Sequence, residues 1–211
     1  MKIFVLTFGL FMFSIVVKSQ FINGISANYG ISLSDLNLES NVSYFRDLGA
    51  KSIVGFYSGI NIESFEGKYL AFVTGIGFYQ KGGLDKFNDE SSINWNLDYL
   101  TIDAKLKAKY RYKNLSPYLL LGPRIDYMLK HGRELDAINN NDVKINKINY
   151  GLRYGIGLQY FIDNFFVGLG WENNYNLNSI VDNNGKSVKP EFTIDDKTMI
   201  FKCEIGFLFN K

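Results

Sequence analysis

The stretch LDYLTIDAKLKAKYRY (97–112), which is followed by KNLS and then by PYLLLGPRIDYMLK (117–130), decides the fold of this chain. Apolar and polar side chains alternate residue by residue in both runs, and strict alternation over this length is typical of β-strands. The four-residue break between the runs predicts a hairpin. From Leu100 onward in the first run, and throughout the second, charged residues occupy only one face of the strand. Lipid on the apolar side and a polar lumen on the other side would produce this pattern, as in a transmembrane β-barrel.

The first 19 residues have the features of a secretory signal peptide. Lys2 supplies a basic start, residues 3–17 are mostly apolar, and Val17-Lys18-Ser19 precedes an expected cut before Gln20. We therefore expect residues 1–19 to be removed and residues 20–211 to form the barrel domain. The alternative for this segment is a buried N-terminal helix. No cysteine follows the expected cut, which argues against a lipoprotein anchor.

The composition limits the possible partners and cofactors. The 211 residues allow one domain, and no run of 18 apolar residues provides a helical membrane span. Without Lys2 and Lys18 the remaining chain has 21 basic and 21 acidic residues, so its charge indicates no nucleic-acid partner. Cys203 is the single cysteine and cannot form an internal disulfide. We expect no metal and no cofactor, because no cysteine or histidine cluster is present.

Eight alternating segments divide the chain after residue 20, and each has an apolar track without Asp, Glu, Lys or Arg. They lie near 21–33, 51–62, 68–80, 97–112, 117–130, 147–162, 165–178 and 197–210. Short connections (63–67, 113–116, 163–164) alternate with long polar ones (34–50, 81–96, 131–146, 179–196). This pattern predicts an all-β fold, an eight-stranded antiparallel up-and-down β-barrel of the outer-membrane type, with both termini in the periplasm.

Glycine placement supports a narrow barrel. Thirteen of the 20 glycines fall on the polar tracks and none on the apolar tracks, and the interior of an eight-stranded barrel has room only for side chains. The rival fold is a secreted, lipocalin-like barrel with the same alternation turned inside out, which would overfill its core. Pro123 lies within a strand that needs its backbone donors, so a bulge or a local break is expected there.

The polar tracks predict a charged lumen. Its expected members are Asp103, Lys105, Lys107, Lys109, Arg111, Arg124, Asp126, Arg153, Glu172, Lys202 and Glu204. Buried charges at this density must pair or stay hydrated. The leading interpretation is a structural plug of ion pairs that fills the barrel. An excess of seven basic over four acidic residues leaves open a lumen that binds or passes small anions, and a gate of switching ion pairs is a third possibility.

No catalytic residues can be nominated. His131 is the only histidine, it falls at the start of a long connection, and no serine or carboxylate can be placed beside it. Some small outer-membrane barrels act on lipids with loop or rim residues, so a lipid-modifying enzyme is an alternative. The sequence pattern does not place a nucleophile next to a base.

Five pieces of the chain together resemble one family. They are GFYQKGG (77–83), LDYLTIDAKLKAKY (97–110), PYLLLGPRIDYML (117–129), YGLRYGIGLQY (150–160) and FKCEIGFLF (201–209). In this order they resemble the PorT-like outer-membrane β-barrel proteins of Bacteroidota. The resemblance implies an eight-stranded outer-membrane barrel without family catalytic residues, and the founding member takes part in type IX secretion. The chain departs from a common barrel ending, because Asn210 and Lys211 follow the aromatic Phe209.

The leading functional hypothesis is a non-enzymatic integral outer-membrane protein with a filled lumen and long extracellular loops, which acts as a scaffold or interaction component. Its expected partners are outer-membrane lipid and other outer-membrane or secretion proteins. A small-solute or anion pore and a lipid-modifying enzyme are the alternatives.

Overall fold

A computed structural model describes residues 22–40, 51–65, 67–88, 91–131, 144–183 and 192–209. The expected signal peptide, residues 1–19, lies outside these ranges. The long strands are β1 (Ile22–Ser40), β2 (Lys51–Ser64), β3 (Leu70–Asn88), β4 (Ser91–Lys109), β5 (Leu115–His131), β7 (Ile148–Ile162), β8 (Phe165–Asn176) and β10 (Phe192–Leu208). Two short strands, β6 (Lys144–Ile145) and β9 (Val181–Asn183), add to one end. The described part of the chain contains no helix of the length and apolarity that crossing a membrane requires.

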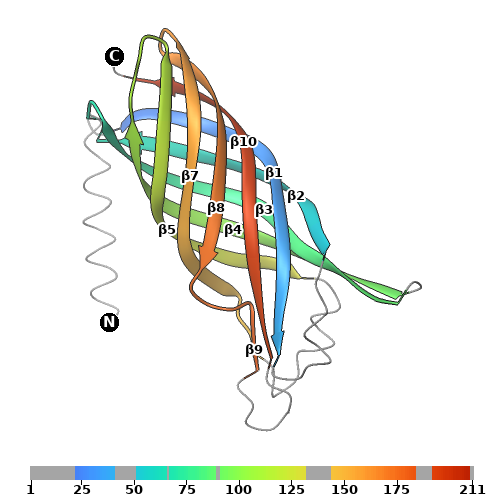
Figure 1. Cartoon of the computed structure of the whole chain (residues 1–211). Coiled ribbons are helices and arrows are strands. Elements are labelled where there is room, and N and C mark those ends of the chain that lie inside the picture. The colour runs from blue at the N-terminus through green and yellow to red at the C-terminus, as the bar shows by residue number, and fades with distance from the viewer. Residues whose placement is uncertain are drawn as a thin grey trace, which may run out of the picture.

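The eight long strands form a closed antiparallel barrel. Each pairs with its neighbour in chain order, and β1 pairs with β10 from Gly24 opposite Leu208 to Ser40 opposite Phe192 (Figure 1). β9 extends the sheet beside the start of β10, and β6 pairs with β9. Because every connection joins adjacent strands, the topology is up-and-down. The prediction of an eight-stranded barrel is confirmed.

The two faces of the wall have opposite chemistry. Along β5, buried and exposed residues alternate without interruption from Leu115 to Leu129. Leu119 and Leu121 point outward and are 59% and 57% exposed, while Arg124 and Asp126 point inward and are at most 1% exposed. Apolar residues outside and charged residues inside are the arrangement of a membrane barrel and the reverse of a lipocalin. The lipocalin-like alternative is therefore wrong.

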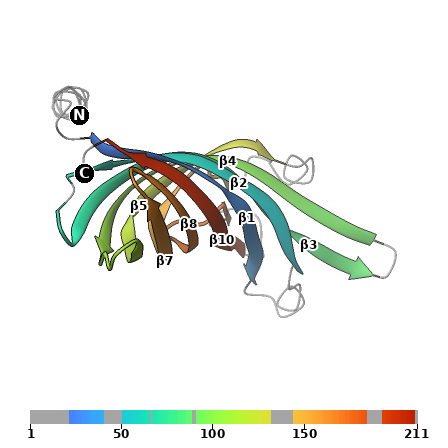
Figure 2. The ribbon, with the colours of Figure 1, turned by 90° about the horizontal axis from the view of Figure 1, so that it is seen from above.

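The strands are longer at the loop end than the alternation predicts. β3 and β4 continue as a paired hairpin through Leu84 opposite Asn94 to Asn88 opposite Ser91, and this hairpin projects beyond the barrel (Figures 1 and 2). The prediction of a loop over 81–96 is wrong there. Beyond the membrane neither face of a hairpin contacts lipid, so the sequence has no reason to alternate. β1 and β10 likewise extend into the predicted connections 34–50 and 179–196.

Pro123 produces a local break in pairing and no bulge. In the ladder between β4 and β5, Asp103 lies opposite Arg124 and the next pair is Leu106 opposite Leu121. The register is therefore the same on both sides of the interruption. Proline cannot donate to the ladder, and Gly122 beside it lets the two backbones approach closely. A Cβ at Gly122 would lie only 2.0 Å from the carbonyl oxygen of Ala104.

Candidate functional site

The lumen contains most of the charged residues predicted from the sequence. Nine of the eleven are buried, with exposed fractions of 6% or less: Asp103, Lys105, Lys107, Arg124, Asp126, Arg153, Glu172, Lys202 and Glu204. Lys109 lies at the periplasmic end of the same group, with 7% of its side chain exposed. These residues come from five different strands, β4, β5, β7, β8 and β10, which shows that the closed barrel brings them together.

Arg111 is the exception to the predicted set. β4 ends at Lys109, and the chain turns through 110–114 before β5 begins, so the side chain of Arg111 is exposed. Its guanidinium carbon lies 4.0 Å from the ring centroid of Phe161, and its Nε donates to the carbonyl oxygen of Lys113. The prediction that Arg111 lies in the lumen is wrong, because the alternation of apolar and polar residues in the sequence continues beyond Lys109, where the strand ends.

Three further charged residues belong to the lumen and were missed. Glu63, Lys81 and Asp196 are 7%, 0% and 4% exposed, but the sequence interpretation placed all three in connections. Each lies two residues from an inward residue of its own strand, so extending the alternation by one step would have found them. Seven basic and six acidic residues thus occupy the described lumen, and the predicted excess of positive charge falls from three to one.

The outer cluster is nearest the long loops and joins β3, β5 and β10. Lys81 Nζ lies 3.1 Å and 3.0 Å from the two carboxylate oxygens of Asp196 and 4.0 Å from Asp126. Arg124 pairs with Asp126, and the Tyr79 hydroxyl donates to that carboxylate at 2.6 Å. Lys81 also lies 4.1 Å from the ring centroid of Tyr99. Two cations and two carboxylates neutralise each other here.

The middle cluster is centred on Glu172. Lys202 Nζ lies 2.7 Å from Glu172 Oε1, and Lys105 Nζ and Arg153 Nε lie 3.9 Å and 3.7 Å from its carboxylate. Asp103 bridges two of these cations, at 2.8 Å from Lys105 and 2.6 Å from Arg153. Three cations and two carboxylates from four strands therefore interlock across the width of the barrel.

The inner cluster fills the periplasmic third. Glu63 accepts from Lys107 and from Lys109 at 2.6 Å each. Lys107 also donates to Gln159 at 2.9 Å, and Gln159 donates to Glu204 at 3.1 Å. Hydrogen bonds thus connect the carboxylates of Glu63 and Glu204 through the ammonium group of Lys107 and the amide of Gln159.

Apolar groups close both ends of this polar column. Phe161, Phe166 and Leu208 pack together at the periplasmic end. At the other end Leu97, Met128 and Ile180 are buried, with exposed fractions of 1%, 3% and 1%. Ile180 belongs to the segment between β8 and β9. A hydrogen bond holds this segment in place, because the backbone N–H of Asn146 donates to the Ile180 carbonyl at 2.8 Å. The three clusters and their apolar ends form a continuous filling.

The lumen offers little for catalysis. Its carboxylates and ammonium groups are engaged with one another, and the hydroxyl of Ser26, which donates to Glu204 Oε1 at 2.8 Å, is buried inside the filled lumen. His131 lies at the end of β5, opposite Leu97 in the ladder. Groups of three or more metal-ligating side chains do not occur in the described ranges.

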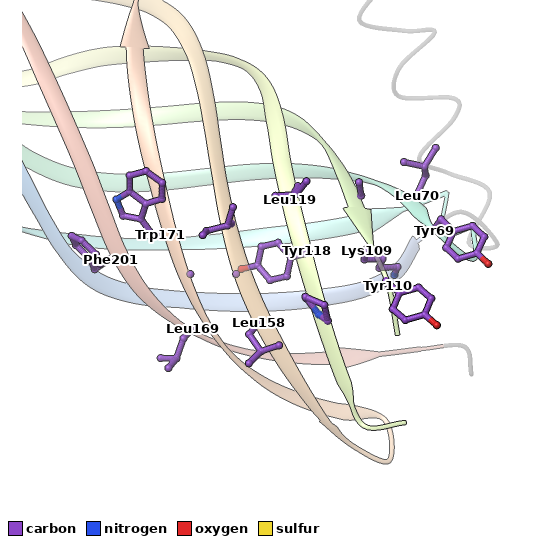
Figure 3. Close-up of a pocket in the computed structure, with 15 residues that line it drawn as sticks. Tyr69, Leu70, Lys109, Tyr110, Tyr118, Leu119, Leu158, Leu169, Trp171 and Phe201 are labelled. Carbon is purple, nitrogen blue, oxygen red and sulfur yellow. The ribbon is translucent and has the colours of Figure 1, made fainter. Parts of the chain in front are cut away.

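A cavity of about 840 Å³ lies against the wall of the barrel (Figure 3). Most of its lining belongs to the outward apolar set, including Leu119, Leu169 and Phe201. Behind it the Tyr118 ring occupies the space beside Gly157, where an added Cβ would lie 2.2 Å from the Tyr118 ring. The depression therefore faces the hydrocarbon of the bilayer and is closed from the lumen by Tyr118.

Comparison with known families decides the assignment. The family model of the outer membrane protein beta-barrel domain matches residues 19–182. The chain belongs to this family. The protein is accordingly a β-barrel of the cell outer membrane, which explains why its apolar residues face outward. Because the chain forms a membrane barrel, its charged inner face lines the lumen. Curated protein sequences give no match.

Solved outer-membrane barrels share the fold at low sequence identity. OprG from Pseudomonas aeruginosa is similar with a TM-score of 0.59 and 12% identity, over 91% of this chain and 98% of that chain. The Neisserial surface protein NspA is similar with a TM-score of 0.51 and 16% identity, over 88% of this chain and 96% of that chain. Similarity at this level extends to the architecture alone.

Proposed function

We propose that this barrel is a plugged, non-enzymatic scaffold of the outer membrane, which acts by holding interaction elements at the cell surface. The observation that carries the proposal is the continuous filling of the lumen by the outer, middle and inner clusters. A solute crossing the barrel would have to separate ion pairs in all three clusters. Separating a buried pair without replacing its partner costs about 3–5 kcal/mol, so three clusters in series oppose conduction strongly.

The β3–β4 hairpin is the element best suited to contact a partner. The pairing of β2 with β3 stops at Leu84, and the pairing of β5 with β4 stops at Leu97. Beyond these residues the hairpin has an edge on each side that pairs with no other described strand. Unpaired backbone N–H and C=O groups at an edge accept an added strand from another chain. The hairpin could therefore dock an extended segment of a partner.

The resemblance to PorT-like proteins of Bacteroidota suggests which partners to seek. Members of an export system in the same membrane would be natural contacts for a scaffold of this kind. The pore alternative has less support, because seven basic residues against six acidic ones give little preference for anions. The lipid-modifying enzyme has less support, because the hydroxyl of Ser26, which lies beside the Glu204 carboxylate, is buried in the filled lumen and away from the lipid-facing surface.

The test is a mild-detergent pull-down of the native protein from outer membranes, with mass spectrometry of what it retains. We expect a stoichiometric partner, and a secretion component would make the protein an export module. Recovery of the barrel alone, in several detergents and after cross-linking of intact cells, would contradict the scaffold.

A further inference from the structure

The wall of the barrel is open at one seam near the loop end. The ladder between β8 and β10 ends at Asn174 opposite Thr198. The next strand on this side of β10 is β9, which pairs with it only from Ile194. Residues 195–197 of β10 therefore have no ladder partner on this side among the described strands. The side chain of Asn176 partly bridges the gap, because its Nδ2 donates to the Asp196 carbonyl at 2.8 Å.

A polar pocket of about 300 Å³ occupies this seam, which is within the usual range for small-molecule sites. Its lining includes Asn174, Asn176, Ser179, Asp195 and Lys197. Amides, a hydroxyl, a carboxylate and an ammonium group together supply both donors and acceptors. This mixture differs from the ion-pair clusters, whose members engage one another.

One buried group in the pocket has no partner within the described structure. Asn174 is 4% exposed, and its Oδ1 accepts from Arg153 Nε at 2.8 Å. That bond fixes the amide, and Nδ2 is left without a hydrogen-bond acceptor among the described residues. Other buried atoms of the described residues also have no hydrogen-bond partner, but Asn174 is the one such residue that lines this pocket. An acceptor oxygen of a bound ligand would satisfy it.

The pocket lies at the level of the lipid headgroups. The 12 residues of β8 rise about 3.3 Å each, and at the tilt of roughly 40° usual for such barrels they span about 30 Å, the thickness of the hydrocarbon. Because β8 starts at a periplasmic turn, its last residues reach the outer interface. Tyr175 and Leu177 face outward there and are 59% and 57% exposed.

We propose that the β8–β10 seam binds a neutral saccharide, through the amide of Asn174 and the polar side chains around it. Sugar hydroxyls donate and accept at once, and this pocket supplies both partners. Asp195 offsets Lys197 and Asp196 is already paired with Lys81, so the pocket has no surplus positive charge for a phosphate or a carboxylate. The saccharide belongs either to the headgroup of an outer-leaflet glycolipid or to a soluble sugar that enters from outside.

The test uses the refolded full-length mature barrel in a detergent without a sugar headgroup. Saturation-transfer NMR with N-acetylglucosamine and with glucose as probes measures binding of free sugar, and enrichment of lipopolysaccharide from mixed micelles measures the glycolipid. Asn174→Asp keeps the oxygen that accepts from Arg153 and removes the unpartnered donor. Asn173→Asp, one residue earlier on the outer face, is the matched control. Ser179→Ala is a second pocket variant, in case Asn174→Asp does not fold.

We expect wild-type binding of at least one saccharide source, a loss of tenfold or more in apparent affinity for Asn174→Asp, and no change for Asn173→Asp. Binding of free sugar identifies a soluble ligand, and enrichment of lipopolysaccharide alone identifies the glycolipid. Absence of both overturns the proposal. Equal binding by the wild type and by the folded pocket variants also overturns it, as does an equal loss in Asn173→Asp.

Discussion

Glu172 occupies the centre of the charged column and illustrates how single residues stabilise this barrel. Its carboxylate lies within 4.0 Å of Lys105, Arg153 and Lys202, and all four side chains are at most 1% exposed. Three cations in a narrow interior would repel one another without the carboxylates between them. Glu172 therefore stabilises the barrel by offsetting the repulsion among these three buried cations.

Glu172→Gln should lower the free energy of unfolding by about 3 kcal/mol, because it leaves buried cations short of a partner. The measurement is urea unfolding in lipid vesicles, followed by tryptophan fluorescence. Lys147→Gln, which removes a charge from an exposed residue between β6 and β7, should change the free energy by less than about 0.5 kcal/mol. Equal effects of the two variants would show that the middle cluster is not stabilising.

Gly122→Ala should destabilise the barrel by about 2 kcal/mol, since the added methyl group would overlap the backbone of β4. The nearest atoms are the Ala104 carbonyl oxygen at 2.0 Å and Lys105 Cα at 2.6 Å, and neither belongs to a flexible side chain. Gly67→Ala, in the turn between β2 and β3, meets its nearest atom at 3.3 Å and serves as the control. The same unfolding titration compares them, and a neutral Gly122→Ala would contradict the close approach.

At the scale of elements, the barrel wall and the β3–β4 hairpin have separate tasks. The wall buries the three clusters and faces lipid, whereas the hairpin beyond Leu84 and Leu97 pairs with no other described strand. Stability and partner binding should therefore be separable by mutation.

Replacing residues 84–94 by Asn-Gly should shorten the hairpin without unfolding the barrel. The pair Gly83 and Trp95 is retained, and Asn-Gly is a favoured two-residue hairpin turn. We expect gel migration of the unboiled protein to resemble the wild type and the partner in the pull-down to be lost. A partner that is still captured would place the contact elsewhere on the barrel.

At the scale of the whole molecule, closure of the sheet joins charges that lie far apart in the chain. Lys81 and Asp196 are 115 residues apart and form a buried pair only because β1 meets β10. The filled lumen is thus a property of the closed barrel and not of any single hairpin.

The folded protein should migrate differently on gels before and after boiling, and it should show no ion-conducting steps in planar bilayers, because the clusters occupy the lumen. A triple variant, Lys105→Ala, Arg153→Ala and Glu172→Ala, removes the middle cluster and should give conducting steps if it folds. Regular conductance by the wild type would contradict the plug and favour the pore.

The sequence by itself determined the strand number, the closed barrel and the facing of ten lumen charges, because lipid imposes an uninterrupted period-two pattern on each membrane-spanning strand. That signal stops where the lipid stops. The length of the β3–β4 hairpin and the points at which the strands end, which leave Lys81 and Asp196 inside strands and Arg111 outside one, were therefore decided by tertiary structure. Which charges pair, and where the β8–β10 seam opens, depends on register between strands distant in sequence. No local pattern in the chain encodes those distances.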